Sequence, residues 1–160
     1  MKKKIKIGTL ISGGGTNLQA IIDSCANGKI YGEIVFTGSD VAGVKGLERA
    51  KKAGIDTFVV DYKKIIIGAR ENLSSLVLPN DFNIEEIKTK QRLINQGDET
   101  KKIEFFLKTR AIAEKELLDR IIPYKIDLLV LAGFMRTFTP YFIDRITNAI
   151  NTISGQENNV

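Results

Sequence analysis

Histidine is absent from all 160 residues of the chain. Imidazole is the usual general acid or base near neutral pH, because its unperturbed pKa is about 6.5. Any acid–base chemistry at neutral pH therefore has to use another kind of side chain or a group supplied from outside this sequence. We also assign no metal ligands.

Cysteine is nearly absent as well, since Cys25 is the single example. One cysteine cannot form an internal disulfide, so nothing in the composition indicates an oxidising compartment, and we expect a cytoplasmic protein. Cys25 follows Leu18, Ile21 and Ile22 at helical spacing, on the apolar face of a predicted helix. Its expected role is that of a small core residue.

Long hydrophobic runs are also missing. No stretch approaches the ~20 apolar residues that a membrane-spanning helix needs. The first residues are basic, but the apolar run that follows is interrupted by Lys6, Gly8 and Thr9 and has no small-residue cleavage site. We therefore expect a strand there rather than a signal peptide, and no membrane partner.

Apart from the lysines at the start of the chain, no long run of charge of one sign occurs along the sequence. There are 24 basic and 19 acidic residues, a net charge of +5, and 43% hydrophobic residues. The hydrophobic fraction is sufficient for one domain with a sizeable core. The positive excess is too diffuse to predict binding to nucleic acid, but it favours a small anionic ligand such as a phosphorylated metabolite.

The chain does contain an alternation of strand and helix patterns. Strand patterns cover 4–11, 33–37 and 56–61, and helical patterns lie between them, over about 16–28 and 44–54. Short connections between such elements predict an α/β fold with an open, parallel, wound sheet.

Residues 62–108 break this rhythm. The segment is long and mostly polar, so we expect an insertion after the third strand, either a surface elaboration with short helices of its own or a mobile flap. One helix inside it is predicted to follow a cap at Asp81 or Asn83.

The alternation resumes at residue 109. A helix is predicted over 109–122, and then a strand over 126–132 that is apolar enough to be buried on both faces. Pro140 predicts the start of another helix. Residues 150–154 are compatible with the start of a further strand, and the polar residues 155–160 are expected to fray.

A glycine-rich turn over residues 12–17 joins the first strand to the first helix. Glycine allows a positive φ and a close approach of the backbone, and the N–H groups at a helix start attract anions. Leu18 stands where a dinucleotide-binding loop has its third glycine, and no Gly-Lys-Ser/Thr sequence closes a nucleotide-binding P-loop. We expect a single phosphate held by main-chain N–H groups and the Thr16 hydroxyl. The alternative is a tight turn with no ligand.

A second candidate segment, residues 133–136, follows the predicted strand over 126–132. Ligands of parallel sheets bind beyond the carboxyl ends of the strands, so this segment and the glycine-rich turn should meet. Phe134 and Met135 offer apolar contacts and Arg136 offers a fixed cation. The alternative is an ordinary strand end whose apolar side chains fill the core. Arg110 stands near a predicted helix start, where an arginine is usually solvated.

Residues 10–22 and 131–136 together resemble the phosphoribosylglycinamide formyltransferases, and residues 46–50 and 53–55 match the same family. The resemblance covers about 5–61 and 109–143. It implies a Rossmann-like formyltransferase fold and the transfer of a formyl group from 10-formyltetrahydrofolate to glycinamide ribonucleotide in purine synthesis. It also implies the residues of two sites. The phosphate of the ribonucleotide would be bound by Gly15, Thr16 and Asn17, and the folate by Arg110, Met135, Arg136, Thr137 and Phe138.

The sequence departs from this family where the family has its catalytic Asn-Ile-His-Pro motif and, later, an aspartate. The corresponding residues 150–155 read Ile-Asn-Thr-Ile-Ser-Gly, so that Asn151 is the one candidate remnant and the catalytic residues are otherwise unknown. We therefore expect residues 1–149 to be the amino-terminal part of the formyltransferase domain, cut short after its fourth or fifth strand, and residues 150–160 to be a diverged or frayed tail.

Three functional interpretations remain open. The first is a truncated formyltransferase that binds the ribonucleotide but transfers formyl weakly or not at all by itself. The second is a formyltransferase for another amine. The third is a non-catalytic module that binds a phosphorylated metabolite or a partner. An uncovered sheet edge also predicts self-association.

Overall fold

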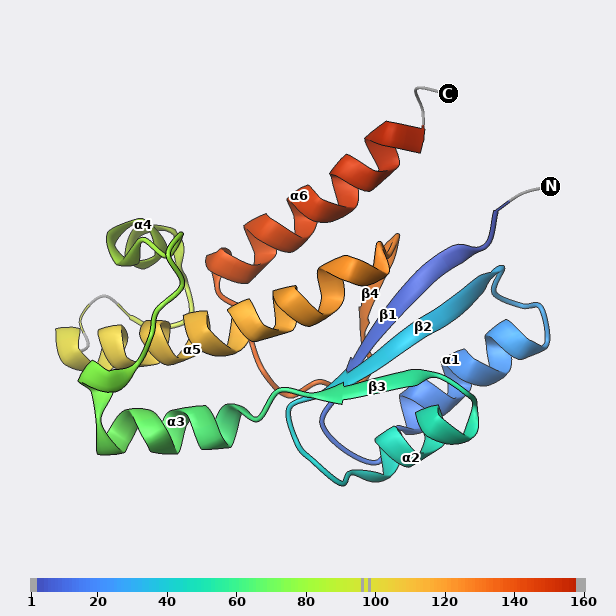
Figure 1. Ribbon diagram of the computed structural model, residues 1–160, viewed down its shortest axis with the longest axis horizontal. Coiled ribbons are helices and arrows are strands. Elements are labelled where there is room, and N and C mark those ends of the chain that lie inside the picture. Colours follow the sequence, from blue (N-terminus) through green and yellow to red (C-terminus); the bar gives the residue numbers. More distant parts are fainter. Residues whose placement is uncertain (1–2, 96, 98, 158–160) are drawn as a thin grey trace.

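Four parallel strands form one sheet within the described part of the computed structural model, residues 3–95, 97 and 99–157. They are β1 (Ile5–Ile11), β2 (Gly32–Ser39), β3 (Asp56–Val59) and β4 (Leu128–Leu131). The spatial order is β3-β2-β1-β4, and each neighbouring pair is parallel. The predicted open parallel sheet is confirmed (Figure 1).

Helices cover the two faces of this sheet. Leu10 and Ile11 are consecutive in β1 and so point to opposite faces, and each belongs to a different core cluster. Ile11 packs in a smaller cluster with residues of α1 (Thr16–Ala26) and α2 (Lys45–Lys52). Leu10 packs in a larger cluster with residues of α5 (Thr100–Ile121) and α6 (Pro140–Glu157). Among the helices of the described residues, none is long and apolar enough to cross a lipid bilayer.

The segment over 62–108 is more helical and more buried than its polar sequence predicts. It forms α3 (Tyr62–Glu71), a short 3₁₀ turn (Leu73–Ser75), α4 (Ile84–Lys90) and the beginning of α5. The predicted cap of α4 is confirmed, because the Asn83 side chain accepts hydrogen bonds from the N–H groups of Glu85 and Glu86. The sequence analysis missed α3 and placed the start of α5 too late.

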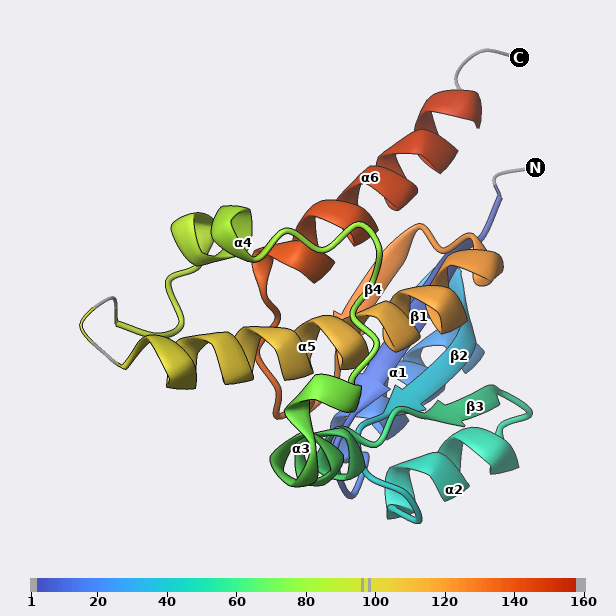
Figure 2. The same cartoon turned by 60° about the vertical axis from the view of Figure 1, so that its left-hand side comes forward.

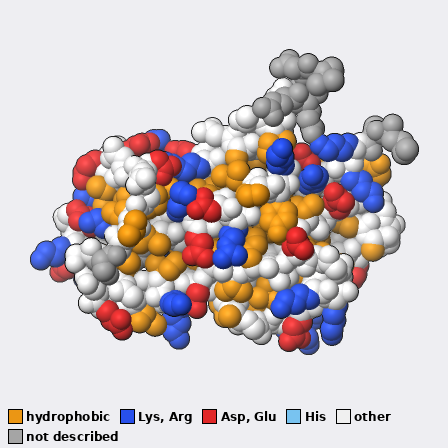
Figure 3. Space-filling model, in the orientation of Figure 1, with side chains coloured by type: hydrophobic (Ala, Val, Ile, Leu, Met, Phe, Trp, Pro, Cys, Tyr) orange, Lys and Arg blue, Asp and Glu red, His pale blue; other side chains and the backbone are white. Residues whose placement is uncertain are grey.

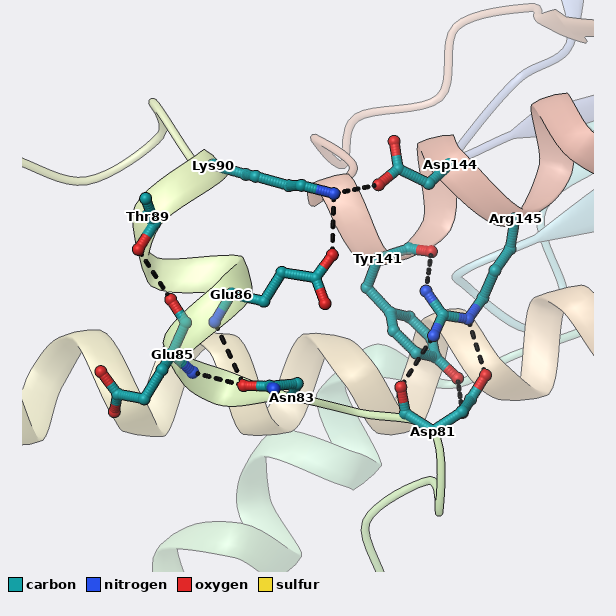
Figure 4. A network of polar contacts seen from close by, with 9 residues as sticks. All are labelled: Asp81, Asn83, Glu85, Glu86, Thr89, Lys90, Tyr141, Asp144 and Arg145. Atoms are coloured by element: carbon teal, nitrogen blue, oxygen red, sulfur yellow. Dashed lines mark hydrogen bonds and ion pairs between the residues drawn. The ribbon is translucent and has the colours of Figure 1, made fainter.

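Contacts with the rest of the chain hold this segment in place. Tyr62, Ile87 and Leu107 are buried in the larger core cluster. The carboxylate of Asp81, just before α4, accepts hydrogen bonds from Tyr141 Oη at 2.9 Å and from Arg145 Nε at 2.7 Å, both on α6 (Figure 4). The segment is therefore an integral part of the helical layer that contains α5 and α6 (Figure 2).

The position of β4 corrects one prediction. The apolar run over 126–132 was expected to be a central strand buried on both faces, but β4 pairs with β1 alone among the described strands and forms an edge of the sheet. Leu128 is 44% exposed and Leu131 is 49% exposed. An apolar run indicates that a strand has apolar surroundings. It does not indicate which residues form those surroundings, and the described residues cover β4 only in part.

The carboxyl-terminal residues correct a second prediction. Residues 150–154 are helical rather than extended, because α6 continues to Glu157. Phe142, Ile146 and Ile150 are spaced by four residues and all pack in or against the larger core cluster, which is the spacing of a helix face. Residues 155–157, which were expected to fray, belong to α6, and residues 158–160 lie outside the described residues.

The surface agrees with the diffuse charge of the sequence. Figure 3 shows one face of the molecule, on which Lys and Arg side chains are interspersed with Asp and Glu side chains. Hydrophobic side chains lie between them. On this face, no broad patch of a single sign gathers over the described residues.

Candidate functional site

The glycine-rich turn places a helix start at the carboxyl end of β1. Gly15 is the N-cap of α1 and has a φ of +73°, a left-handed conformation that favours glycine. A Cβ at Gly15 would lie 2.5 Å from the Cα of Gly46, so the turn also packs directly against the start of α2. Thr16 and Asn17 are exposed. The first N–H groups of a helix have no partner within the helix, which makes this exposed start suitable for an anion.

Residues of α2 donate hydrogen bonds to the carbonyl groups of the turn. Gly46 N donates a hydrogen bond to Gly13 O at 3.0 Å, and Arg49 Nε donates to Gly14 O at 3.0 Å. Arg49 and Gln19 also line an open cavity of about 340 Å³, together with Lys45, Glu48, Lys52 and Ala53. The carbonyl groups of the turn are thus directed toward α2, and its surroundings are mainly basic.

Ser12 connects the glycine-rich turn to the segment after β4. Its Oγ accepts a hydrogen bond from Met135 N at 2.8 Å and donates one to Asp40 Oδ1 at 2.5 Å. Its N–H donates to Gly133 O at 3.2 Å. The expectation that the two candidate segments meet is therefore confirmed by direct contacts.

Asp40 follows β2 and is 3% exposed. Its second carboxylate oxygen, Oδ2, accepts a hydrogen bond from Arg136 Nε at 2.7 Å. The Arg136 side chain is 28% exposed and the Asp40 side chain is 2% exposed, so the ion pair is largely removed from water. The predicted cation of Arg136 is present in the site, and it is neutralised on one side by a carboxylate.

Arg110 and Arg136 converge on one aromatic ring. The Cζ of Arg110 lies 5.1 Å from the ring centroid of Tyr62, and that of Arg136 lies 5.3 Å from it. Arg110 also lies 5.0 Å from the ring centroid of Phe106. Contacts of this kind stabilise cations that are partly removed from water. Arg110 is therefore not the solvated arginine that its predicted position suggested.

Two polar atoms of this cluster lack hydrogen bonds. Tyr62 Oη and Arg110 Nη1 are buried and have no hydrogen-bond partner among the described residues. Burial lowers the pKa of Arg110 and raises the pKa of Tyr62, because in each case it disfavours the charged form. Buried donors without partners are rare in proteins and call for an explanation.

A buried carboxylate, that of Glu114, lies next to the same cluster. Glu114 of α5 is fully buried and accepts hydrogen bonds from Thr139 N at 2.8 Å and from Thr139 Oγ1 at 2.5 Å. Burial raises the pKa of Glu114 to about 7, against the opposing effects of the Thr139 hydrogen bonds and the Arg110 charge. Glu114 therefore fixes the beginning of α6 to the helix that carries Arg110.

The other predicted folate residues differ in exposure: two are exposed to solvent and one packs against the core. Met135 is 80% exposed, and Thr137 is exposed. Phe138 stacks between Phe134, at 5.4 Å, and Phe142, at 4.0 Å, and its ring packs against the larger core cluster. Met135 and Thr137 are thus exposed to solvent, whereas the Phe138 side chain packs against the core.

Asn151 is not brought to the site. It is an exposed residue in the carboxyl-terminal half of α6. This half, red in the ribbon views, lies away from the turn between β1 and α1 (Figures 1 and 2).

The sequence analysis missed three residues of the site, Asp40, Tyr62 and Glu114, and also the role of Ser12 within the predicted turn. Ser12 and Asp40 could have been found, because each is a polar residue at the carboxyl end of a strand. Tyr62 and Glu114 gave no signal, since one begins the apparent insertion and the other lies inside a helix with no distinctive motif.

Comparisons with known proteins identify the family of the chain. A family model described as formyl transferase matches residues 5–153. The phosphoribosylglycinamide formyltransferase of Escherichia coli (strain K12) is 30% identical over 149 residues, which are 93% of this chain and 50% of that protein. The protein of the same name from Haemophilus influenzae is 33% identical over 148 residues, which are 92% of this chain and 50% of that protein. The chain spans about half the length of these curated relatives.

Solved structures give the same picture. The chain is similar to glycinamide ribonucleotide transformylase 1 from Symbiobacterium toebii, with a TM-score of 0.58 and 30% identity, over 90% of this chain and 48% of that one. It is also similar to the phosphoribosylglycinamide formyltransferase from Coxiella burnetii, with a TM-score of 0.59 and 28% identity, over 89% of this chain and 47% of that one.

Proposed function

Because the chain belongs to the formyl transferase family, we propose that it is the substrate-binding, amino-terminal part of a phosphoribosylglycinamide formyltransferase. Such an enzyme transfers a formyl group from 10-formyltetrahydrofolate to glycinamide ribonucleotide in purine synthesis. One observation supports the proposal above the others, namely the exposed start of α1, which follows Gly15 in a left-handed conformation that favours glycine. We place the protein in the cytoplasm.

The phosphate of glycinamide ribonucleotide binds at Gly15, Thr16 and Asn17. The unpaired N–H groups of the first turn of α1 donate to its oxygens, and the positive end of the helix dipole favours its charge. Arg49 holds the Gly14 carbonyl toward α2, so that this carbonyl does not oppose the anion.

The folate ligand binds along Arg110, Met135, Arg136, Thr137 and Phe138. Folates carry carboxylate groups, which guanidinium groups bind well. The unpartnered Nη1 of Arg110 and hydroxyl of Tyr62 fit such a ligand, since each needs a hydrogen-bond partner that the described residues do not provide. Met135 and Thr137 are exposed beside them. When bound, 10-formyltetrahydrofolate supplies the formyl carbon.

The described residues hold substrates but offer little for the chemical step. Attack of an amine on a formyl carbon needs a donor for the oxyanion and an acceptor for the ammonium proton. The chain has no histidine, and Asn151 is exposed on α6. We therefore expect the 160-residue chain to bind the ribonucleotide and to form no formylated product above background.

Calorimetric titration with glycinamide ribonucleotide tests the first part. The native chain and Gly14→Ala should bind it, because a Cβ at Gly14 meets no atom within 4 Å, whereas Gly15→Ala should not. Equal binding by all three proteins would contradict the phosphate site. A formylation assay with both substrates tests the second part, and product formed by the purified chain would contradict it.

We further propose that the outer edge of β4 mediates self-association. Its strand is unpaired on that side among the described residues, and Leu128 and Leu131 are about half exposed. Uncovered edge strands are templates for pairing with another chain. Analytical ultracentrifugation should show concentration-dependent association, and Leu131→Lys should weaken it. A stable monomer at all concentrations would contradict this proposal.

A further inference from the structure

We propose that Asp40 is a positioning residue that couples the glycine-rich turn to the segment containing Met135 and Arg136, so that ligands at the two places strengthen each other's binding. The identity of the ligands rests on the proposed function. The coupling itself rests on contacts between three strand ends.

Asp40 uses one carboxylate oxygen for each side of the site. Oδ1 accepts from Ser12 Oγ at 2.5 Å, and Ser12 precedes the glycine-rich turn. Oδ2 accepts from Arg136 Nε at 2.7 Å. The Ser12 hydroxyl completes the connection, because its oxygen accepts from Met135 N at 2.8 Å while its proton is directed to Asp40.

Burial makes this connection stiff. The Asp40 side chain is 2% exposed, so water cannot readily replace a partner that moves away. A buried carboxylate that loses a hydrogen-bond donor keeps the cost of its desolvation. If Ser12 or Arg136 moved away, the buried Asp40 carboxylate would lose a hydrogen-bond donor. The two sides of the site therefore move together.

The partners of Asp40 are also fixed from outside. Arg136 lies 5.3 Å from the ring centroid of Tyr62, which is 1% exposed. Ser12 N donates to Gly133 O at 3.2 Å, which joins the ends of β1 and β4 a second time. An anion that orders the turn consequently orders Met135 N and the Arg136 guanidinium, and a ligand on that segment orders the turn. Such coupling is reciprocal by thermodynamic necessity.

Asp40→Asn is the test variant, because it keeps the shape and one acceptor oxygen but turns an amide donor toward Arg136. Asp119→Asn is the control, since Asp119 is exposed on α5 and pairs there with Lys115. Circular dichroism and thermal unfolding establish that both variants fold.

Hydrogen–deuterium exchange of the ligand-free proteins is the first measurement. In Asp40→Asn, amide exchange should rise in residues 12–17 and also in residues 134–137, while Asp119→Asn matches the native chain. An increase in one of these segments alone, or in neither, would overturn the proposal. This result does not depend on which ligands the protein takes.

Ligand binding is the second measurement. Folic acid is titrated with and without saturating inorganic phosphate. Phosphate should tighten binding of folic acid about fivefold in the native chain and in Asp119→Asn, and by no measurable factor in Asp40→Asn. Tightening that persists in Asp40→Asn, or that is absent from the native chain, would overturn the coupling. Failure of either compound to bind would instead count against the proposed function, and the exchange measurement would still decide the link.

Discussion

The two sides of the candidate site are built from different parts of the polypeptide. The phosphate side consists of main-chain groups from six consecutive residues, 12–17, whose shape depends on glycine. The folate side depends on side chains from segments distant in sequence, since Arg136 is held by the buried carboxylate of Asp40, 96 residues away. A site made of main chain is sensitive to added atoms, whereas a site made of side chains is sensitive to charge and to protonation.

The largest effect is expected from Gly15→Val, which adds atoms to the main-chain side. A left-handed conformation costs a side chain about 1–2 kcal/mol, and overpacking against Gly46 adds about 1–3 kcal/mol, so unfolding should become easier by roughly 4 kcal/mol. Phosphate binding should be lost. Urea denaturation and phosphate titration measure the two effects. Gly14→Ala is the matched control, with a change within about 0.5 kcal/mol. A similar loss of stability and phosphate binding in Gly14→Ala would show that any side chain in the turn is harmful, whether or not it clashes.

A change of pH should alter the stability of the part of the site that is built from side chains, through the ionisation of Glu114. Its pKa in the folded protein is about 7, above its ordinary value of 4.5. The folded state therefore binds more protons between these values. The stabilisation is fully present below pH 4.5 and is lost as the pH rises through 7. The total is on the order of 3 kcal/mol.

Urea denaturation at a series of pH values checks this, with Glu114→Gln as the reference because glutamine does not titrate. The stability of the native chain relative to Glu114→Gln should fall between pH 4.5 and pH 7. The groups facing Glu114 are Thr139 and Arg110, and neither changes its charge in this interval. A constant difference between the two proteins would mean that Glu114 is ionised throughout.

Tyr62→Phe removes one polar atom from the part of the site that is built from side chains. The Tyr62 hydroxyl is buried without a partner, so its removal should stabilise the ligand-free protein by roughly 1–2 kcal/mol. Binding of folic acid should weaken at the same time, because the hydroxyl is expected to bond to the ligand. Thermal unfolding and fluorescence titration measure the two quantities. Destabilisation with unchanged binding would assign the hydroxyl a structural role.

The smallest effects are expected from the surface contacts in Figure 4. Asp81→Ala removes the two side-chain hydrogen bonds that reach α6 and keeps the one that the Asp81 main-chain oxygen accepts from Arg145, and the Asp81 side chain is 54% exposed. Solvent screening should therefore limit the loss to about 1 kcal/mol. Lys90→Met breaks exposed pairs with Glu86 and Asp144 and should leave the melting temperature unchanged. Equal losses in the two variants would indicate that the exposure of the pairs does not determine their contribution.

The same comparison explains what could be predicted from the sequence. The turn over 12–17 was predictable because glycine conformation and helix starts are local properties, and the open parallel sheet followed from the alternation of strands and helices. The cluster of Asp40, Tyr62 and Arg110 was not, because its members come from separate elements and meet only after the helical layer has packed. The burial of parts of the segment 62–108 was not predictable for the same reason. Its buried apolar residues, such as Ile87, belong to a core cluster shared with other helices.

The pairing of Gly15 with Gly46 also limits how this protein can evolve. A Cβ at Gly15 would reach the Gly46 Cα, and one at Gly46 would lie 2.8 Å from Gly13 O and 3.1 Å from the Gly15 Cα. Most clashes in a core can be relieved by a compensating mutation that makes the neighbour smaller. Here the neighbour is already glycine, and although a Cβ at Gly46 would also meet the Ile11 side chain, the obstructing atoms within the turn belong to the backbone. Each missense change in either codon therefore lacks a second-site repair at its partner, and lineages that retain the ligand are expected to retain both glycines.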